Sequence, residues 1–188
     1  MIKAVIFDCF GVFTEDGWLA FCRQYGTDDI AEELRYINHQ ADRGRVSYED
    51  FLDTVCKLTG ASRGVAHEMI TTNHHPNTAL FTYAQELKAA GYKLGMISNV
   101  GSELNNFLPQ EYVDLFDAVT LSYHVGVIKP DAVIYLKHLA ELELPAEACV
   151  FIDDREVNVV GAQAVGMQAV AYTNIEQVKT DLVALGVE

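Results

Sequence analysis

Short apolar runs that stop abruptly at a polar residue recur along this chain. The run 4–7 stops at Asp8, and a later run, 150–152, stops at Asp153. Continuous apolar runs without polar alternation are typical of strands buried on both faces, as in parallel sheets. We therefore predict five buried strands, at residues 4–7, 93–97, 118–121, 150–152 and 168–172.

Apolar residues at helical spacing lie between most of these runs. They predict helices that end at Gly91, begin at Pro130 and span residues 158–165. In the second of these helices, the spacing of Ala132, Leu136 and Leu139 predicts the buried face. Alternating strands and helices with short links favour right-handed crossovers. The predicted fold class is α/β, with an open, Rossmann-like parallel sheet and flanking helices.

The region from residue 14 to residue 77 departs from this rhythm. It contains amphipathic helical patterns, such as Phe51, Val55 and Leu58 behind a helix start at Ser47, and no convincing strand. We expect residues 14–77 to form a small inserted α-helical cap. Residues 1–13 and 78–188 would then form the α/β core.

The composition of the chain narrows the classes of function. Half of the 188 residues are hydrophobic, which excludes a disordered chain. The formal net charge of -14 repels a phosphate backbone, so we expect no nucleic-acid partner. Apolar stretches all fall short of the roughly 18 residues that a membrane helix needs. The opening run is too short for a signal sequence, so we expect a cytoplasmic protein with no membrane partner.

Polar side chains that can carry chemistry follow the predicted strands. Asp8, the pair Ser98–Asn99 and the pair Asp153–Asp154 each end a strand, and Lys129 lies in a loop shortly after another. In open α/β sheets, ligands bind beyond the carboxyl ends of the strands. We therefore expect these carboxylates, the hydroxyl, the amide and the ammonium group to converge on one edge of the sheet.

Four segments, in this order, resemble the motifs of the haloacid dehalogenase-like superfamily of hydrolases. They are Phe7–Val12, Ser98–Asn99, Lys129–Pro130 and Phe151–Asn158, the last continuing to Gly166. The predicted cap stands where that family carries its helical cap. Within the family, the chain looks most similar to small sugar-phosphate phosphatases of the α-glucose-1-phosphate type. The resemblance implies a small phosphorylated metabolite as substrate.

The resemblance also implies a nucleophile and a cofactor. Asp8 would attack phosphorus and form an aspartyl-phosphate. Because like charges oppose this attack, Mg²⁺ would sit between them, and a hard cation takes oxygen ligands. Asp8, the main-chain carbonyl of Phe10 and Asp154 would bind it. Asp153 would either bind the ion directly or contact the residues that bind it. Asn158 would support these ligands through water.

Three further residues receive roles from the same resemblance. Ser98 and the Asn99 amide would donate hydrogen bonds to the phosphoryl oxygens. Lys129 would neutralise developing charge and hold Asp8 in place. Ser98, Asn99 and Lys129 would therefore all bind substrate, and Lys129 would also be catalytic.

Phe10 departs from the pattern of the family phosphatases, which carry there a second Asp that protonates the leaving oxygen. General acid–base help is worth roughly 10²- to 10⁴-fold in rate. Candidates for replacing it are Glu15, Asp16 and His124. An aromatic at this position also resembles 2-haloacid dehalogenases, which leaves that activity as one alternative. A non-catalytic binding domain that retains the cation pocket is the other.

Overall fold

A five-stranded, fully parallel sheet forms the centre of the protein. The computed structural model describes residues 1–71 and 75–187. The strand order is β3-β2-β1-β4-β5, with every neighbouring pair parallel. The strands are β1 (Ala4–Phe7), β2 (Lys93–Ser98), β3 (Ala118–Leu121), β4 (Cys149–Asp153) and β5 (Gln168–Ala171). This arrangement confirms the predicted α/β class and the open parallel sheet.

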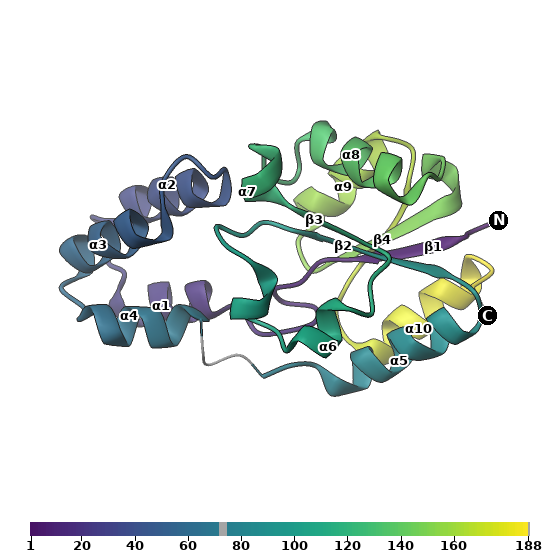
Figure 1. Cartoon of the computed structure of the whole chain (residues 1–188), viewed down its shortest axis with the longest axis horizontal. Helices are drawn as coiled ribbons and strands as arrows, with labels where there is room; N and C mark the ends of the chain where they lie inside the picture. Colours follow the sequence, from purple (N-terminus) through teal and green to yellow (C-terminus); the bar gives the residue numbers. More distant parts are fainter. Residues whose placement is uncertain (72–74, 188) are drawn as a thin grey trace.

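Helices cover both faces of the sheet. Figure 1 shows α5 and α10 on one face and α8 and α9 on the other. These helices are α5 (Thr78–Ala89), α8 (Ala132–Leu142), α9 (Glu156–Ala164) and α10 (Ile175–Ala184). Side chains of β1 alternate between the two cores, with Val5 and Phe7 in one and Ala4 and Ile6 in the other. Because both faces are buried, the strand is apolar throughout.

The predicted buried face of α8 is wrong. Leu136 is 53% exposed, and Ala132 is also exposed, although Leu139 is buried as expected. The helix instead buries Ile134, Tyr135, His138, Leu139 and Leu142. Apolar residues surround most of this helix, so their spacing alone fits more than one face, and the packing against β2 and β3 selects one.

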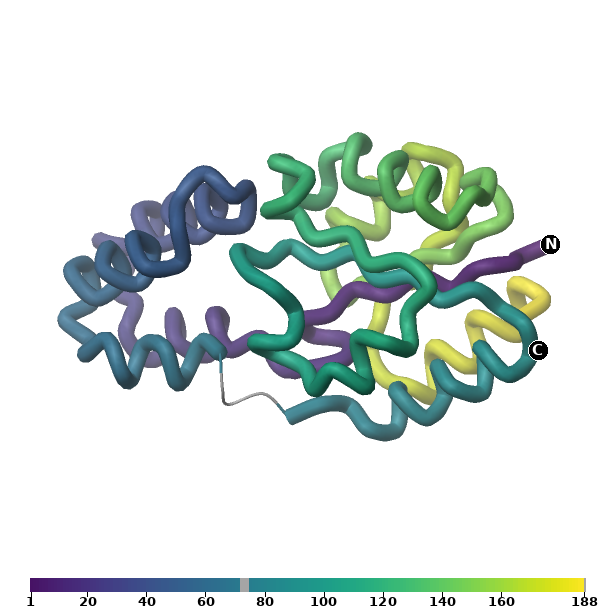
Figure 2. The backbone as a smooth tube through the Cα atoms, viewed as in Figure 1, coloured from purple at the N-terminus to yellow at the C-terminus, as the bar shows by residue number. Residues whose placement is uncertain are grey.

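Between β1 and α5, four helices pack around a hydrophobic cluster of their own. They are α1 (Gly17–Tyr25), α2 (Ala31–Asp42), α3 (Tyr48–Thr59) and α4 (Arg63–Thr71). Asp16 caps α1 and Ser47 caps α3, each accepting a hydrogen bond from a first-turn amide. Figure 2 shows these helices at one end of the molecule, beyond the strands. We propose that residues 14–77 form a cap on a core of residues 1–13 and 78–188.

The cap touches the core where α2 ends. The Ser122 hydroxyl, at the start of α7 (Ser122–Val125), donates a hydrogen bond of 2.6 Å to the main-chain carbonyl of Asp42. Ala41 lies against Gly101, where an added Cβ would come within 3.1 Å of the alanine Cβ. These contacts hold the last turn of α2 over the loop that follows β2.

The short elements α6 (Gln110–Val113), η1 (Leu104–Asn106) and η2 (Ala146–Ala148) complete the connections. Within residues 1–71 and 75–187, no helix has the length and apolar character required to cross a bilayer.

Candidate active site at the carboxyl edge of the sheet

Asp8 lies directly beyond the central strand β1. Its backbone N–H donates to the carbonyl of Ile152, and its side chain is almost fully buried. The carboxylate accepts a hydrogen bond of 2.6 Å from the Cys9 N–H and contacts the Lys129 ammonium at 2.7 Å. Burial raises the pKa of Asp8 well above its ordinary value; Lys129 opposes this shift and Asp153 adds to it.

Lys129 joins the ends of three strands. Its ammonium group donates to the Ile97 carbonyl at 2.9 Å and to Asp153 at 2.8 Å, besides its contact with Asp8. Burial opposes its charge, but the two carboxylates outweigh burial and raise the Lys129 pKa. Lys129 therefore carries a positive charge inside the protein, between two acids.

Asn99 orients the backbone of Lys129. Its side-chain oxygen accepts from the Lys129 N–H at 2.8 Å, and its amide nitrogen donates to the Lys129 carbonyl at 3.3 Å. The peptide bond that follows, to Pro130, is cis. We predicted that the Asn99 amide would bind phosphoryl oxygens; the structure shows its side chain holding the lysine in position.

Asp153 is fully buried, and protein donors surround it. Asn158 donates to both of its oxygens at 3.0 Å, and the Arg155 N–H donates at 2.9 Å. Burial opposes ionisation of this carboxyl group, but Lys129 and these hydrogen bonds together lower its pKa. With its oxygens engaged in this way, Asp153 is better suited to orienting Lys129 than to binding an ion directly.

Asp154 is the exposed acid of the pair and faces the loop after β1. One ligand atom each from Asp8, Asp153 and Asp154 lies within 4.8 Å of the others. Gly11, at φ 83°, lets Asp154 approach, because a Cβ there would lie 2.5 Å from the Asp154 carboxylate. A side chain at Gly11 would therefore push this carboxylate away from Asp8.

The donor set fits a hard divalent cation such as Mg²⁺. Carboxylate oxygens are the ligands that Mg²⁺ prefers, and three of them converge here. Among the described residues, the Asn158 side-chain oxygen and the Ser98 hydroxyl are also buried without a hydrogen-bond partner. Buried polar atoms rarely stay unpaired, so these two suit the water of a metal site and a bound anion.

A cavity of about 430 Å³ opens over this edge of the sheet and extends under the cap. Asp8, Phe10, Asn99, Lys129 and Asp154 line it, whereas Ser98 and Asp153 lie behind the lining. The Phe10 ring stacks edge-on against Phe107 at 5.1 Å between ring centres, which closes one wall.

Of the three predicted substitutes for the missing acid, Asp16 alone lines this cavity. Glu15 pairs with His75 at 3.5 Å, and His124 pairs with Glu103 at 3.4 Å. Both therefore point to partners outside the cavity lining.

The cap contributes several residues to the cavity lining, and the sequence analysis did not single out Asp42 among them. Asp42 stands on the last turn of α2, buried and facing the cavity. Besides Asp16, the other cap residues of the lining are Trp18, Leu19, Arg35, Asn38, His39, Ala41, Tyr48, Phe51 and Ile70. Helical periodicity alone could not separate the residues that face the cavity from those that fill the core of the cap.

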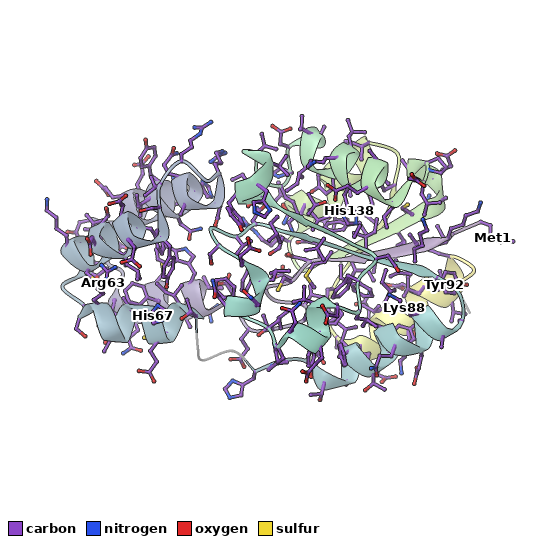
Figure 3. The ribbon with its side chains drawn as sticks, in the orientation of Figure 1. Met1, Arg63, His67, Lys88, Tyr92 and His138 are labelled. Carbon is purple, nitrogen blue, oxygen red and sulfur yellow. The ribbon has the colours of Figure 1, made fainter. Side chains whose placement is uncertain are left out.

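Several titratable side chains outside the carboxylate cluster have structural partners, and that of His67 is Tyr48, which lines the cavity. Figure 3 labels Arg63 and His67 on α4, in the cap, and His138 on α8. Arg63 pairs with Glu49 and Asp53. His138 is buried, which lowers its pKa to about 4, and its ring hydrogen-bonds Thr120 at 2.8 Å. These groups serve packing, so the chemistry concentrates at the sheet edge.

Comparison with known proteins identifies the family and supports the fold. Residues 2–166 match the haloacid dehalogenase-like hydrolases. The chain is 29% identical over 180 residues to the sesquiterpene phosphatase astK of Aspergillus oryzae, covering 92% of this chain and 90% of that protein.

Two solved structures share the fold. A predicted hydrolase of this family from Porphyromonas gingivalis superposes with a TM-score of 0.78 at 24% identity, covering 100% of this chain and 99% of that one. An enzyme of the family from Bacteroides thetaiotaomicron, in complex with magnesium and inorganic phosphate, gives 0.74 at 21% identity, covering 92% and 95%. The family match includes β1 to β4 and all four motifs, so the resemblance inferred from the motifs is confirmed. This chain is an enzyme that belongs to the haloacid dehalogenase-like hydrolases.

Proposed function

We propose that this protein is a Mg²⁺-dependent phosphomonoester hydrolase that forms an aspartyl-phosphate on Asp8. The observation that carries this proposal is the meeting of Asp8, Lys129 and Asp154 at the floor of one cavity. Phosphoryl transfer through a covalent intermediate requires a nucleophilic carboxylate, a fixed positive charge and a second carboxylate that binds a cation. The magnesium and phosphate found with the Bacteroides thetaiotaomicron enzyme support the same chemistry here.

In this mechanism each residue has one task. Asp8 attacks phosphorus, while the Lys129 ammonium group, 2.7 Å from its carboxylate, holds it in place and offsets developing negative charge. Asp8, Asp154 and the Phe10 carbonyl would hold Mg²⁺, which supplies positive charge to the phosphoryl oxygens when bound. The buried Ser98 hydroxyl, which has no partner among the described residues, is available to donate to a phosphoryl oxygen.

Two substrate classes fit the cavity. A small sugar phosphate, our prediction from the sequence, suits the polar face of α2, where Arg35, Asn38 and His39 line the cavity. A phosphate with an apolar body is the second candidate. Trp18, Phe51 and other apolar cap side chains line the cavity, and the relative from Aspergillus oryzae is named a sesquiterpene phosphatase.

The paired acids of β4 argue against 2-haloacid dehalogenation. Dehalogenases of this family attack carbon without a metal and lack the pair. Here Asp153 and Asp154 stand with Asp8 within 4.8 Å, and the single positive charge of Lys129 does not balance three carboxylates, which favours a further cation. A non-catalytic binding domain would keep the cation pocket and show no turnover, so activity measurements separate the three possibilities.

A phosphatase screen tests the proposal. Phosphate release is measured over sugar phosphates and prenyl phosphates, with Mg²⁺ and with a chelator, and halide release from 2-haloacids is measured in parallel. We expect phosphate release that depends on Mg²⁺. Asp8→Asn should abolish it, by more than about 10⁴-fold, because the amide is not a nucleophile. Halide release without metal, or Mg²⁺ binding without any turnover, would reject the proposal.

A further inference from the structure

The direction of attack places the leaving group under the cap. In phosphoryl transfer the attacking and leaving oxygens stand roughly in line on opposite sides of phosphorus. Asp8 approaches from the sheet, so the leaving oxygen points away from the sheet into the cavity that the cap closes. The residue that protonates this oxygen must therefore reach the cavity from the cap side. Phe10 carries no proton to give.

Asp42 is the buried acid on that side. It ends α2, is 8% exposed, and shares the cavity with Asp8, Lys129 and Asp154. One of its carboxyl oxygens accepts a hydrogen bond of 2.9 Å from the Asn38 amide. Its main-chain carbonyl accepts from the Ser122 hydroxyl of the core at 2.6 Å, which fixes the residue when the cap is docked.

We propose that Asp42 protonates the leaving oxygen, in place of the acid that is absent at Phe10. This inference rests on the proposed phosphatase function and adds a catalytic residue to it. The cap would then provide part of the reaction machinery, in addition to enclosing the substrate.

The surroundings of Asp42 let its carboxyl group hold a proton up to about neutral pH. Burial, and then the negative charge of Asp16, raise its pKa to about 7, against the opposing effects of Arg43, Arg155 and the Asn38 hydrogen bond. His39, on the same helix, has a lowered pKa because it is partly buried and faces arginines, so it adds little charge. A proton donor with a pKa near the working pH is the most effective kind.

The other acids at the cavity are committed to different tasks. Asp16 accepts a hydrogen bond of 2.9 Å from the Leu19 N–H and so caps α1. Asp154 stands beside Asp8 in the carboxylate cluster. Asp42 is the one cavity-lining acid of the described residues that is both buried and outside that cluster.

The proton balance closes over the two half-reactions. In the first, the Asp8 oxygen forms a bond to phosphorus, the bond from phosphorus to the leaving oxygen breaks, and the Asp42 proton passes to that oxygen to give a free alcohol. In the second, water attacks phosphorus and gives a proton to the Asp42 carboxylate. The bond to Asp8 breaks, inorganic phosphate leaves, and both side chains return to their starting states.

Substrates that differ in leaving group test this role in the full-length enzyme with Mg²⁺. p-Nitrophenyl phosphate releases a stable anion that needs little protonation, whereas benzyl phosphate releases an alkoxide of similar size that needs a proton. We expect Asp42→Asn to lower kcat on benzyl phosphate by about 10²- to 10⁴-fold and on p-nitrophenyl phosphate by far less. The Asp16 charge helps to raise the Asp42 pKa, so this control is compared at a pH well below 7, where Asp42 keeps its proton without it; there Asp16→Asn, which can still cap α1, should lower both alike, if at all.

Two more measurements keep the test independent of how well one variant folds. In the unmodified enzyme, the ratio of benzyl to p-nitrophenyl turnover should fall as pH rises above about 7, and Asp42→Asn should remove that dependence. Adding Phe10→Asp to Asp42→Asn should restore activity on benzyl phosphate, while Phe10→Asp alone should gain little.

The outcomes separate the two proposals. An equal loss on both substrates in Asp42→Asn, no loss on either, or the leaving-group effect appearing in Asp16→Asn instead would overturn the role of Asp42 and leave the phosphatase function standing. If the unmodified enzyme releases no phosphate from either substrate or from the screened metabolites, the proposed function fails, and the inference fails with it.

Discussion

At the carboxyl edge of the sheet, the buried carboxylates Asp8 and Asp153 share the Lys129 ammonium group, whereas in the cap the buried carboxyl of Asp42 accepts a hydrogen bond from a neutral amide. The pKa of Asp153 is lowered, while that of Asp42 rises to about 7. Both acids are removed from water, so their different partners account for the different directions.

This difference assigns different chemistry to the two regions. Beside Lys129 the carboxyl of Asp153 stays ionised, and the same cation opposes the rise that burial causes in the pKa of Asp8, whereas Asp42 has no such partner and keeps its proton up to about pH 7. The sheet edge is therefore suited to nucleophilic attack and the cap to proton transfer. Substitutions of these acids and of the groups around them should change stability and turnover differently in the two regions.

Removing the shared cation should have the largest effect. Lys129→Met leaves Asp8 and Asp153 buried without a positive charge, which should cost about 3–5 kcal/mol in the free energy of unfolding. Turnover should fall by about 10²- to 10³-fold, because the fixed charge beside the nucleophile is lost. Denaturant unfolding and phosphate release measure the two effects.

Lys137→Met is the matched control for this substitution. Lys137 pairs with Glu141 at 3.3 Å on the surface of α8, and exposed ion pairs contribute less than about 1 kcal/mol. Equal stability losses in the two variants would show that Lys129 does not compensate buried charge.

Replacing the cap acid Asp42 should raise the free energy of unfolding, whereas replacing Lys129 lowers it. The folded protein raises the pKa of Asp42 from 3.8 to about 7, so the unfolded chain releases this proton first as pH rises. Folding stability should therefore fall between about pH 4 and pH 7, by up to about 4 kcal/mol. Asp42→Asn removes this penalty, and it should be more stable than the unmodified protein at pH 8 and nearly equal to it at pH 4.

Thermal or urea unfolding at the two pH values checks this prediction. A variant that gains stability at pH 8 and loses activity on poor leaving groups would distinguish a proton donor from a residue that only supports packing. Equal stability of the two proteins at pH 8 would show that folding does not raise the pKa of Asp42.

Ser98 offers the smallest and most selective test of the sheet edge. Among the described residues, its buried hydroxyl has no hydrogen-bond partner, so Ser98→Ala should change stability by less than about 1 kcal/mol. If Ser98 binds a phosphoryl oxygen, phosphate release should still fall by about 10- to 100-fold, the worth of one hydrogen bond to a charged group.

Ser122→Ala is the comparison for this variant, because the Ser122 hydroxyl bonds both Val100 and Asp42 and its loss should destabilise the protein. Unchanged activity in Ser98→Ala would remove Ser98 from the site. That result matters because Ser98 lies behind the cavity lining, although its motif predicts contact with substrate.

Local sequence patterns were sufficient to predict the strands, because both faces of the sheet are buried. Most residues of the strands are apolar because helices cover both faces of the sheet, so the strand positions could be predicted to within a few residues. The face of α8 could not, because Leu136 and Ile134 are equally apolar and only packing against the sheet distinguishes them.

In the candidate site, too, some positions could be predicted from the sequence and others could not. The sequence placed Asp8, Lys129 and Asp154 at one edge, and the structure brings them together there, because strand ends of a parallel sheet meet at one edge. The position of Asp42 in the cavity could not be predicted, because an acid at the end of an amphipathic helix looks like any solvated residue until the cap docks. The candidates Glu15 and His124 lie close to the motifs in sequence, yet their side chains pair outside the cavity.

The order of apolar runs and the residues that end them determined by themselves the parallel sheet, the reactive edge and the family, because each depends on contacts within a strand or between neighbouring strands. The tertiary structure alone decided that Asp153 supports Lys129, that Asn99 orients it, and that the buried acid Asp42 of the cap lines the same cavity as Asp8. Those outcomes depend on how far each group is removed from water and on which partner it meets there, and neither quantity is encoded in the spacing of residues along the chain.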